Sequence, residues 1–305
     1  MTMRPSENEA AGSTGHQDHI MREALFYEKA EGGIAICALC PRRCAIPPGA
    51  TGTCLARRNL GGTLYSLNYS KISSLSLDPI EKKPLYRFHP GSWILSAGSF
   101  GCNFMCPFCQ NHSISRSIPQ TYDMPPESLV ERALLARADG NIGIAYTYNE
   151  PIIWYEYVKE TAALGAAAGL RNVLVTNGCI EHAPLDALLP YIDAMNVDLK
   201  GDDEFYSELC KGWRAPVIRT IEASHAAGCH VEATMLLVSG RNDNRAAVEG
   251  AALSIAAISE EIPLHLSRFF PRYKMAGARP TDPAFVFEAA VLARRHLKYV
   301  YPGNV

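Results

Sequence analysis

The sequence predicts an α/β protein built from parallel βαβ units and preceded by a small cysteine-rich region. From residue 93 onward, short apolar runs alternate with longer helical stretches, as they do in parallel βαβ units. Polar residues follow directly after several of these apolar runs. Seven of the ten cysteines lie in two short stretches. Right-handed crossovers would wind the βαβ units into either a barrel or a doubly wound sheet.

Composition narrows the class of protein. The chain has 305 residues, of which 48% are hydrophobic and 20% charged, which is ordinary for one large core or a barrel with a small appendage. Its net charge of −2 gives no general attraction to nucleic acid or to a membrane. No apolar run approaches the roughly 20 residues of a membrane span, and residues 1–22 lack the apolar core of a signal peptide. Clustered cysteines without a secretory signal favour metal or cluster binding, so we expect a cytoplasmic protein.

The N-terminal part begins with a polar stretch over residues 1–21, which predicts a disordered leader. A short helix is expected at about 20–30, packed on the rest of the protein. Four cysteines then follow at C-x2-C-x3-C-x9-C spacing: Cys37, Cys40, Cys44 and Cys54. Four thiolates on loops bent by Gly and Pro can close a metal site, which would hold either structural zinc or a second [4Fe–4S] cluster.

Residues 60–92 connect this region to the α/β part. Gly61-Gly62 predicts a turn, and the alternating stretch 63–67 predicts a short hairpin strand. Residues 78–85 carry prolines near both ends and predict a loop. Its charges would form a solvated face or cover the mouth of the barrel. The sequence leaves both possibilities open.

The next element is a strand over about 93–98, followed by three cysteines at C-x3-C-x2-C spacing. We call Cys102, Cys106 and Cys109 the trident. A [4Fe–4S] cluster normally takes four cysteines, so three leave one iron open for another ligand. The alternative is a zinc knuckle with His112 as the fourth ligand, which we consider less favoured.

Alternating strands and helices follow the trident. Strands are expected at about 143–147, 172–176, 194–199, 230–238 and 264–266. Helices are expected at about 125–138, 151–169, 181–190, 202–210, 215–227, 244–259 and 282–296. Because parallel barrels carry their chemistry at the carboxyl ends of the strands, the residues just after each strand are the candidate site.

Three of these strand ends carry suitable polar groups. Asn149 and Glu150 follow the second strand, where the carboxylate could accept hydrogen bonds from an ammonium group or serve as a first-turn acid of the next helix. Asn177 follows the third strand, beside a glycine that lets the backbone approach a ligand. Asp198 and Lys200 follow the fourth and share one face, which we expect to point into the lumen.

The last strand offers two candidate catalytic residues. His265 would lie on the substrate side, although a structural role is about as well supported. Tyr273 could donate a hydrogen atom or act in redox chemistry, although a packing role is the more common one for tyrosine.

These motifs resemble those of radical S-adenosylmethionine (SAM) enzymes, which share the trident spacing and an aromatic residue at the position of Phe108. The chain is most similar to the radical SAM member of the AmmeMemoRadiSam system, a group related to pyruvate formate-lyase-activating enzymes. The resemblance spans about residues 22–304 and rests on CALCPRRCAIPPGATGTCLARRN, DPIEKKPLYRFHPGS, GSFGCNFMCPFCQN, YTYNEP, VTNG, NVDLKG, HLSRFFPRYKM and YPGN. Relative to that family, Tyr148-Asn149 replaces two glycines and Ser239 replaces a proline, and this sequence ends at Val305, before a cysteine-containing tail.

The resemblance implies a partial (β/α)6, TIM-like radical SAM barrel over residues 93–305, with residues 22–92 as the cysteine-rich metal-binding region. It implies that the trident holds a [4Fe–4S] cluster. The residues that it carries over as SAM contacts are Asn149, Glu150, Asn177, Asp198 and Lys200, with Phe108 beside the cluster.

The implied activity is that of an oxidoreductase-like enzyme. Reductive cleavage of SAM would give a 5′-deoxyadenosyl radical that abstracts hydrogen from an unidentified small-molecule or protein substrate. An external one-electron donor of flavodoxin or ferredoxin type would supply the electron. The alternatives are an activase that installs a glycyl radical on a partner protein, and a non-catalytic zinc-binding scaffold.

Overall fold

The computed structural model describes residues 21–305, so the expected leader lies outside the described residues except for Met21. Eight strands form one sheet, in the order β16-β15-β14-β13-β12-β11-β9-β8. The strands are β8 (Ser74–Pro79), β9 (Trp93–Gly98), β11 (Asn141–Tyr146), β12 (Arg171–Thr176), β13 (Ala194–Asp198), β14 (His230–Leu237), β15 (Leu264–Arg268) and β16 (Val300–Gly303). Seven of them run parallel, and β8 pairs antiparallel with β9 at one edge.

Helices connect the parallel strands. They are α1 (His112–Ser115), α2 (Pro126–Leu135), α3 (Tyr155–Ala167), α4 (His182–Leu188), α5 (Asp203–Phe205), α6 (Ala215–Ala226), α7 (Arg245–Ala256) and α8 (Pro283–Ala293). Short 3-10 turns are η1 (Glu31–Gly33), η2 (Ile80–Lys82), η3 (Ala136–Asp139), η4 (Pro151–Trp154), η5 (Leu189–Tyr191) and η7 (Tyr273–Met275), and η6 (Tyr206–Cys210) is a π-helix.

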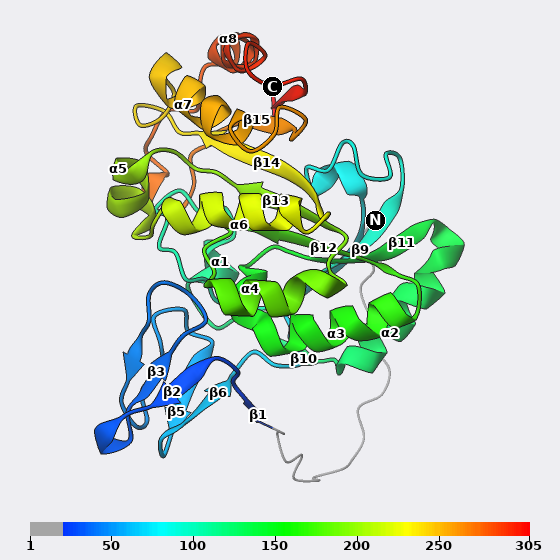
Figure 1. Cartoon of the computed structure of the whole chain (residues 1–305), viewed down its shortest axis with the longest axis vertical. Helices are drawn as coiled ribbons and strands as arrows, with labels where there is room; N and C mark the ends of the chain where they lie inside the picture. Colours follow the sequence, from blue (N-terminus) through cyan, green and yellow to red (C-terminus); the bar gives the residue numbers. More distant parts are fainter. Residues whose placement is uncertain (1–20) are drawn as a thin grey trace.

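The predicted fold class is confirmed. Six βα units run from β9 to β16, and β8 and β16 remain as the two edges of the described sheet. The barrel is therefore partial, and Figure 1 shows the sheet curving with α2, α3, α4 and α6 on one of its faces. None of the described helices is both long and apolar enough to cross a membrane.

Short antiparallel strands make up the cysteine-rich region. β1 (Arg22–Glu23), β6 (Thr63–Ser66) and β5 (Arg57–Leu60) form one sheet, and β2 (Tyr27–Lys29), β3 (Ala35–Cys37) and β4 (Ala45–Ile46) form another. A third pairs β7 (Lys71–Ile72) with β10 (Tyr122–Asp123). Figure 1 shows β1–β6, in blue, as a lobe close to α1. The division at residue 93 stays a prediction, and β8 crosses it by pairing with β9.

The helix expected at about 20–30 is wrong. Tyr27 pairs with Cys37 across β2 and β3, and Arg22 pairs with Ser66 across β1 and β6. Strand pairing overrides the local helical preference of this stretch, because it supplies the backbone hydrogen bonds that a helix would make internally.

The two faces of the large sheet differ in what covers them. Side chains alternate between faces along each strand, and the helix-covered face packs a large apolar core that includes Leu95, Tyr146 and Met195. The inner face carries a smaller apolar cluster that includes Ile94 and Val173, and also polar groups, among them Asn196 and Glu232. The segment 80–88 closes the inner face at the amino ends of the strands, where Asn196 Nδ2 donates to the Pro84 carbonyl at 2.8 Å. This segment positions the floor below the candidate site.

Candidate functional site

The trident loop leaves the carboxyl end of β9 and turns sharply at Gly101. This residue has φ +90°, and a Cβ there would lie 2.3 Å from the Cys54 carbonyl oxygen. Asn149 holds the loop: its Oδ1 accepts from the Ser99 N–H at 2.8 Å, and its Nδ2 donates to the carbonyls of Phe100 and Gly101. The backbone path therefore depends on the missing side chain of Gly101 and on the amide of Asn149.

Hydrogen-bond donors face two of the trident thiols. The Phe104 N–H lies 3.3 Å and Asn177 Nδ2 lies 3.7 Å from Cys102 Sγ. Ser115 Oγ lies 3.2 Å from Cys109 Sγ. Burial raises the pKa of Cys102 and of Cys109 above the ordinary value of a thiol. Donors aimed at sulfur stabilise bound thiolates, so this loop fits a cluster whose ligands must be deprotonated.

The arrangement does not fit a single ion. Among residues 21–305, no three Cys, His, Asp or Glu side chains converge closely enough to hold one metal ion. The ligands of a zinc ion must meet at one point, whereas ligands of a [4Fe–4S] cluster bind separate corners of a cube. His112, the fourth ligand of the zinc-knuckle alternative, has its Nδ1 3.3 Å from the Cys109 carbonyl oxygen.

Glu150 links the ends of two neighbouring strands. Its carboxylate accepts hydrogen bonds from Thr176 Oγ1 at 2.6 Å, from the Asn177 N–H at 2.8 Å and from the Ile152 N–H at 3.1 Å. The residue is only 4% exposed, and this burial raises its pKa to about 7. Glu150 is the N-cap residue of η4. Its carboxylate is also close enough to Cys102 for their charges to interact.

Asp198 and Lys200 form an ion pair at the end of β13. Lys200 Nζ lies 2.6 Å from Asp198 Oδ2, and the Asp198 side chain keeps 36% of its surface exposed. Although burial opposes it, the negative charge of Asp198 keeps the pKa of Lys200 above its ordinary value, with further contributions from Cys106 and Cys210. The pair thus lies near the trident with an accessible carboxylate.

Two other predicted contacts have a largely structural environment. The amide of Asn149 is committed to the backbone of the trident loop, as described above. Phe108 is 4% exposed and packs against Phe205, with ring centroids 5.7 Å apart.

A model of the family described as "Radical SAM superfamily" matches residues 98–251, about half of the chain. This chain is also 42% identical over 293 residues to a protein of Methanocaldococcus jannaschii named Uncharacterized protein MJ0808, covering 93% of this chain and 86% of that protein. The chain belongs to the radical SAM superfamily. Members of this superfamily are enzymes that use a [4Fe–4S] cluster, SAM and an external electron donor.

Several solved structures share the fold. SuiB of Streptococcus suis superimposes with a TM-score of 0.55 at 12% identity, covering 69% of this chain and 48% of SuiB. This chain therefore spans about half the length of SuiB. A radical SAM methyltransferase from Sphaerobacter thermophilus gives a TM-score of 0.53 at 17% identity, covering 70% of this chain and 67% of that one. SuiB has also been solved with SAM bound, and that structure superimposes with a TM-score of 0.50 at 13% identity, covering 67% of this chain and 48% of SuiB.

The two predicted catalytic residues occupy different ends of this radical SAM fold. His265 is the second residue of β15, 4% exposed, with Nε2 2.6 Å from Glu232 and its ring against Tyr86 and Tyr301. Tyr273 instead lies beside the trident, stacked on His112 with ring centroids 4.5 Å apart. The structure thus brings Tyr273 to the trident and surrounds His265 with partners inside the sheet.

The His265 site is held by a fully buried carboxylate. Glu232 also accepts from His230 Nε2 at 2.9 Å and from the backbone N–H of Arg87 at 2.8 Å. Burial alone would raise the pKa of Glu232, but the hydrogen bonds from His230, His265 and Arg87 lower it to about 2. This carboxylate joins segment 80–88 to β14 and β15.

The sequence analysis missed a polar group on the inner face of the sheet, beneath Tyr148 and opposite the start of β9. Lys83 Nζ lies 2.9 Å from Asp78 Oδ2, and the Tyr148 hydroxyl donates to the same oxygen at 2.7 Å. Asp78 and Lys83 are buried, and Tyr148 has φ +72°, which is strained for a residue other than glycine. The charges of residues 78–85 therefore belong partly to the barrel interior. The only sequence signal for them is the replacement of two glycines by Tyr148-Asn149.

Cys210 was also missed. It is buried in η6, its carbonyl accepts from the Met105 N–H at 2.9 Å, and a hydrogen bond between its thiol and Cys106 raises the pKa of Cys106. No motif in the sequence connects this cysteine with the trident, because the contact depends on how η6 packs.

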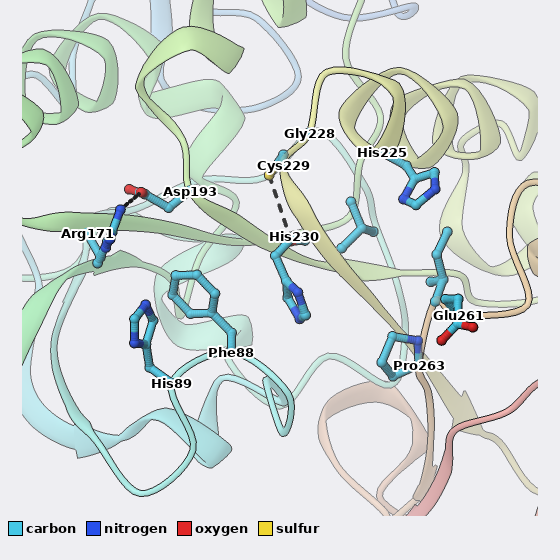
Figure 2. Close-up of a pocket in the computed structure, with 12 residues that line it drawn as sticks. Phe88, His89, Arg171, Asp193, His225, Gly228, Cys229, His230, Glu261 and Pro263 are labelled. Atoms are coloured by element: carbon cyan, nitrogen blue, oxygen red, sulfur yellow. Dashed lines mark hydrogen bonds and ion pairs between the residues drawn. The ribbon is translucent and has the colours of Figure 1, made fainter.

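Concave sites also lie away from the three trident cysteines. All four N-terminal cysteines line one small cavity, together with Arg42, Arg57 and Asn103. A separate pocket of about 490 Å³ lies at the amino ends of β12 and β14, where Figure 2 shows Arg171 paired with Asp193 opposite Phe88 and His89. Arg171 and His230 are the first residues of their strands, so this pocket lies at the end of the sheet opposite to the trident.

Proposed function

We propose that this protein binds a [4Fe–4S] cluster through Cys102, Cys106 and Cys109 and SAM at the open iron beside them. The observation that carries this proposal is the convergence of the trident with polar groups from three strand ends. Asn177 Nδ2 lies 3.7 Å from Cys102 Sγ, and the Asn177 N–H donates to the Glu150 carboxylate. Lys200 lies close enough to Cys106 for their charges to interact. When bound, the cluster supplies the electron that cleaves SAM to methionine and a 5′-deoxyadenosyl radical.

The polar residues divide into two roles in this proposal. Asp198 and Lys200 have opposite charges and partial access, which suits the ribose hydroxyls and the carboxylate of SAM. Glu150 would face the ammonium group, whose positive charge would favour its ionised form despite burial. Asn149 and Phe108 would position the trident loop instead of contacting SAM.

The substrate would occupy the inner face of the sheet. There the network of Asp78, Lys83 and Tyr148 forms a polar wall, and Tyr273 lies at the rim beside the trident. A strained tyrosine held by a buried carboxylate is a fixed hydrogen-bonding group, as substrate orientation requires. His265, enclosed by Glu232 and two tyrosines, would hold the floor in place.

The finer family assignment is also a proposal. Eight motif segments over residues 22–304 support membership of the AmmeMemoRadiSam group. A low-potential donor of flavodoxin or ferredoxin type would reduce the cluster, and the reducing cytoplasm would suit it. Hydrogen abstraction from a small molecule is the primary hypothesis, and activation of a glycyl-radical partner is an outcome that the experiment below distinguishes.

The experiment is anaerobic reconstitution with iron and sulfide, reduction with dithionite and addition of SAM, followed by quantitation of 5′-deoxyadenosine. We expect formation by the wild type and a fall to background for Cys102→Ala. Cys229→Ala is the matched control, because this buried thiol precedes β14 at the other end of the sheet and should leave the rate unchanged.

Equal 5′-deoxyadenosine formation by Cys102→Ala and wild type would refute the proposal. Stimulation by a metabolite extract would indicate a small-molecule substrate. Stimulation by the protein fraction alone, with a glycyl-radical signal in electron paramagnetic resonance, would replace the primary hypothesis by the activase.

A further inference from the structure

The four cysteines Cys37, Cys40, Cys44 and Cys54 form what we call the N-terminal cysteine site. They come from three segments of the lobe and line one cavity. Cys37, Cys40 and Cys54 are buried, and Cys44 is half-buried. Four thiols directed at one cavity are a complete ligand set for a thiolate-bound metal centre.

An unpaired donor lines the same cavity. The side chain of Arg57 is 1% exposed, and its terminal nitrogens bind Glu156 at 2.6 Å and the Leu25 carbonyl at 2.8 Å. Its Nε has no hydrogen-bond partner among the described residues, although it is buried. Glu156 Oε2 is unpaired as well, but Glu156 does not line the cavity. Leaving a buried donor unpaired costs about 1–3 kcal/mol. A bound group that accepts a hydrogen bond from Arg57 Nε would remove this cost.

The backbone around the site is shaped for an occupant. Arg43, just before Cys44, has φ +40°, and Leu55, just after Cys54, has φ +68°. Such conformations are strained for these residues and persist where the surroundings fix them. A Cβ on Gly52 would lie 3.1 Å from Ile46 Cδ1 and 3.9 Å from Cys54 Sγ, so glycine keeps space open next to this thiol.

Zinc and a [4Fe–4S] cluster differ in how their thiolate ligands are arranged. Four thiolates on zinc, each about 2.3 Å from the ion, must converge on one point. No three metal-binding side chains of residues 21–305 converge in that way, although these four line a common cavity. Ligands of a [4Fe–4S] cluster bind separate corners of a cube and need not meet at one point, so the four thiols of this cavity suit a cluster better than a single ion.

We propose that the N-terminal cysteine site holds a second iron–sulfur cluster of [4Fe–4S] type, with Arg57 Nε donating a hydrogen bond to one of its sulfur atoms. All four irons would have protein ligands, so this cluster would be closed to SAM. Arg57 and Arg42, both of which line the cavity, would offset part of its negative charge.

The site is built directly against the trident loop. The carbonyl of Cys54 fills the space where Gly101 lacks a side chain, and Asn103, the neighbour of Cys102, lines the cavity. The Arg42 guanidinium donates from Nη2 at 3.0 Å and from Nε at 3.2 Å to the Asn103 carbonyl. Occupation of the N-terminal cysteine site would thus support the loop that carries the first cluster.

The decisive test uses a variant without the trident, in which Cys102, Cys106 and Cys109 are all replaced by Ala. After anaerobic reconstitution we expect about four irons and four sulfides per chain, absorbance near ~400 nm and a dithionite-induced paramagnetic resonance signal. Wild-type protein should carry about eight irons. One zinc and no iron in the variant, or a folded variant without metal, would overturn the proposal.

Two further measurements keep the result interpretable. If the variant does not fold, the wild-type count decides, because about four irons with one zinc contradicts a second cluster even where SAM cleavage is intact. Arg57→Lys keeps the ion pair with Glu156 but removes the Nε donor, and it should shift the midpoint potential of the second cluster to more negative values. An unchanged midpoint potential in Arg57→Lys would exclude the hydrogen bond from Arg57. Lys29→Arg, on the exposed surface of the lobe, is the control and should leave the potential unchanged.

Discussion

The two cysteine sites of this radical SAM protein have the same kind of ligand on opposite kinds of scaffold. The trident follows β9, a six-residue strand paired on both sides within the eight-stranded sheet. The N-terminal cysteine site rests on β3 and β4, strands of three and two residues in a three-stranded sheet. Such short sheets are marginal alone. The sheet positions the trident loop, whereas under the proposal above the lobe would depend on the metal centre that its cysteines hold.

The surroundings of the two sites differ in the same sense. All three trident cysteines are half-buried, and an accessible carboxylate, Asp198, lies near them. Three of the four N-terminal cysteines are buried, and Arg57 beside them is enclosed. A site that must admit a substrate keeps an open side, and one that supports neighbouring structure can be closed.

Removing metal from both sites should give the largest contrast. We expect amides in residues 22–66 to lose at least about 100-fold of their protection against hydrogen exchange, because opening the lobe would no longer break metal–thiolate bonds. Amides of β11 and β12 should keep theirs, since these strands are paired on both sides. Exchange measured by mass spectrometry before and after chelation checks this. Equal loss in both regions would contradict the comparison.

Gly101→Ala tests the contact between the two sites. The added Cβ would meet the Cys54 carbonyl at 2.3 Å, and Ile153 at 2.8 Å, so neighbouring backbone must move. We expect more than about 4 kcal/mol of destabilisation, at the extreme of single substitutions. Gly228→Ala is the control, because it has φ +81° but nothing within 4 Å of the added atom. It should cost about 1–2 kcal/mol from backbone strain alone. Similar denaturant midpoints for the two variants would show that the sites do not press on one another.

The parallel sheet could be predicted because its signals are local. Apolar runs such as 172–176 end at polar turn residues, and β12 (Arg171–Thr176) and β9 (Trp93–Gly98) lie within a residue of the expected bounds. The lobe could not, because β1 is held by β6 far along the chain and β2 is held by its pairing with β3. For residues of that kind, tertiary pairing decides the conformation and the local pattern carries little information.

The candidate site divides in the same way. Spacing alone revealed the trident and the N-terminal cysteines, because metal ligands on one loop leave a fixed pattern. No pattern in the sequence indicated that Asp78 and Lys83 are buried, since Asp78 meets Tyr148 only through the packing of a distant segment, and Cys210 reaches Cys106 only through the packing of η6. The sequence could also not show that the Asn149 amide is hydrogen-bonded to the backbone of the trident loop. An asparagine can either stabilise a loop in this way or contact SAM, and the residue type does not distinguish the two roles.

Glu150→Gln tests the buried carboxylate near the trident through the pH dependence of the free energy of unfolding. The ordinary pKa of the carboxyl is 4.5, and burial raises it to about 7 in the folded protein. Between these pH values the folded state keeps a proton that the unfolded state has released, so stability is highest below 4.5 and falls as the pH rises through 7. The loss is on the order of 3 kcal/mol. Gln cannot titrate, so its variant should lack this slope in the metal-free protein.

Urea unfolding of the metal-free protein at several pH values measures the slope. Glu131→Gln, on the exposed side of α2, is the control and should follow the wild type. A slope in Glu150→Gln equal to that of the wild type would mean that the carboxyl is not held in a buried environment.

Tyr148→Phe should give the smallest effect and tests whether the polar wall of the inner face is rigid. The variant loses the hydrogen bond to Asp78 at 2.7 Å, an acceptor that carries charge, so we expect a loss of about 2 kcal/mol in stability. Tyr155→Phe is the control: its hydroxyl donates to the neutral Pro184 carbonyl at 2.8 Å, and its loss should be about 1 kcal/mol. Denaturant unfolding at equal metal loading measures both. Asp78 would keep its ion pair with Lys83, so the variant should change the orientation of these side chains but not their charge. The rate of 5′-deoxyadenosine formation without substrate should therefore stay at the wild-type value. A fall in that rate would move Tyr148 from the substrate wall to the SAM site.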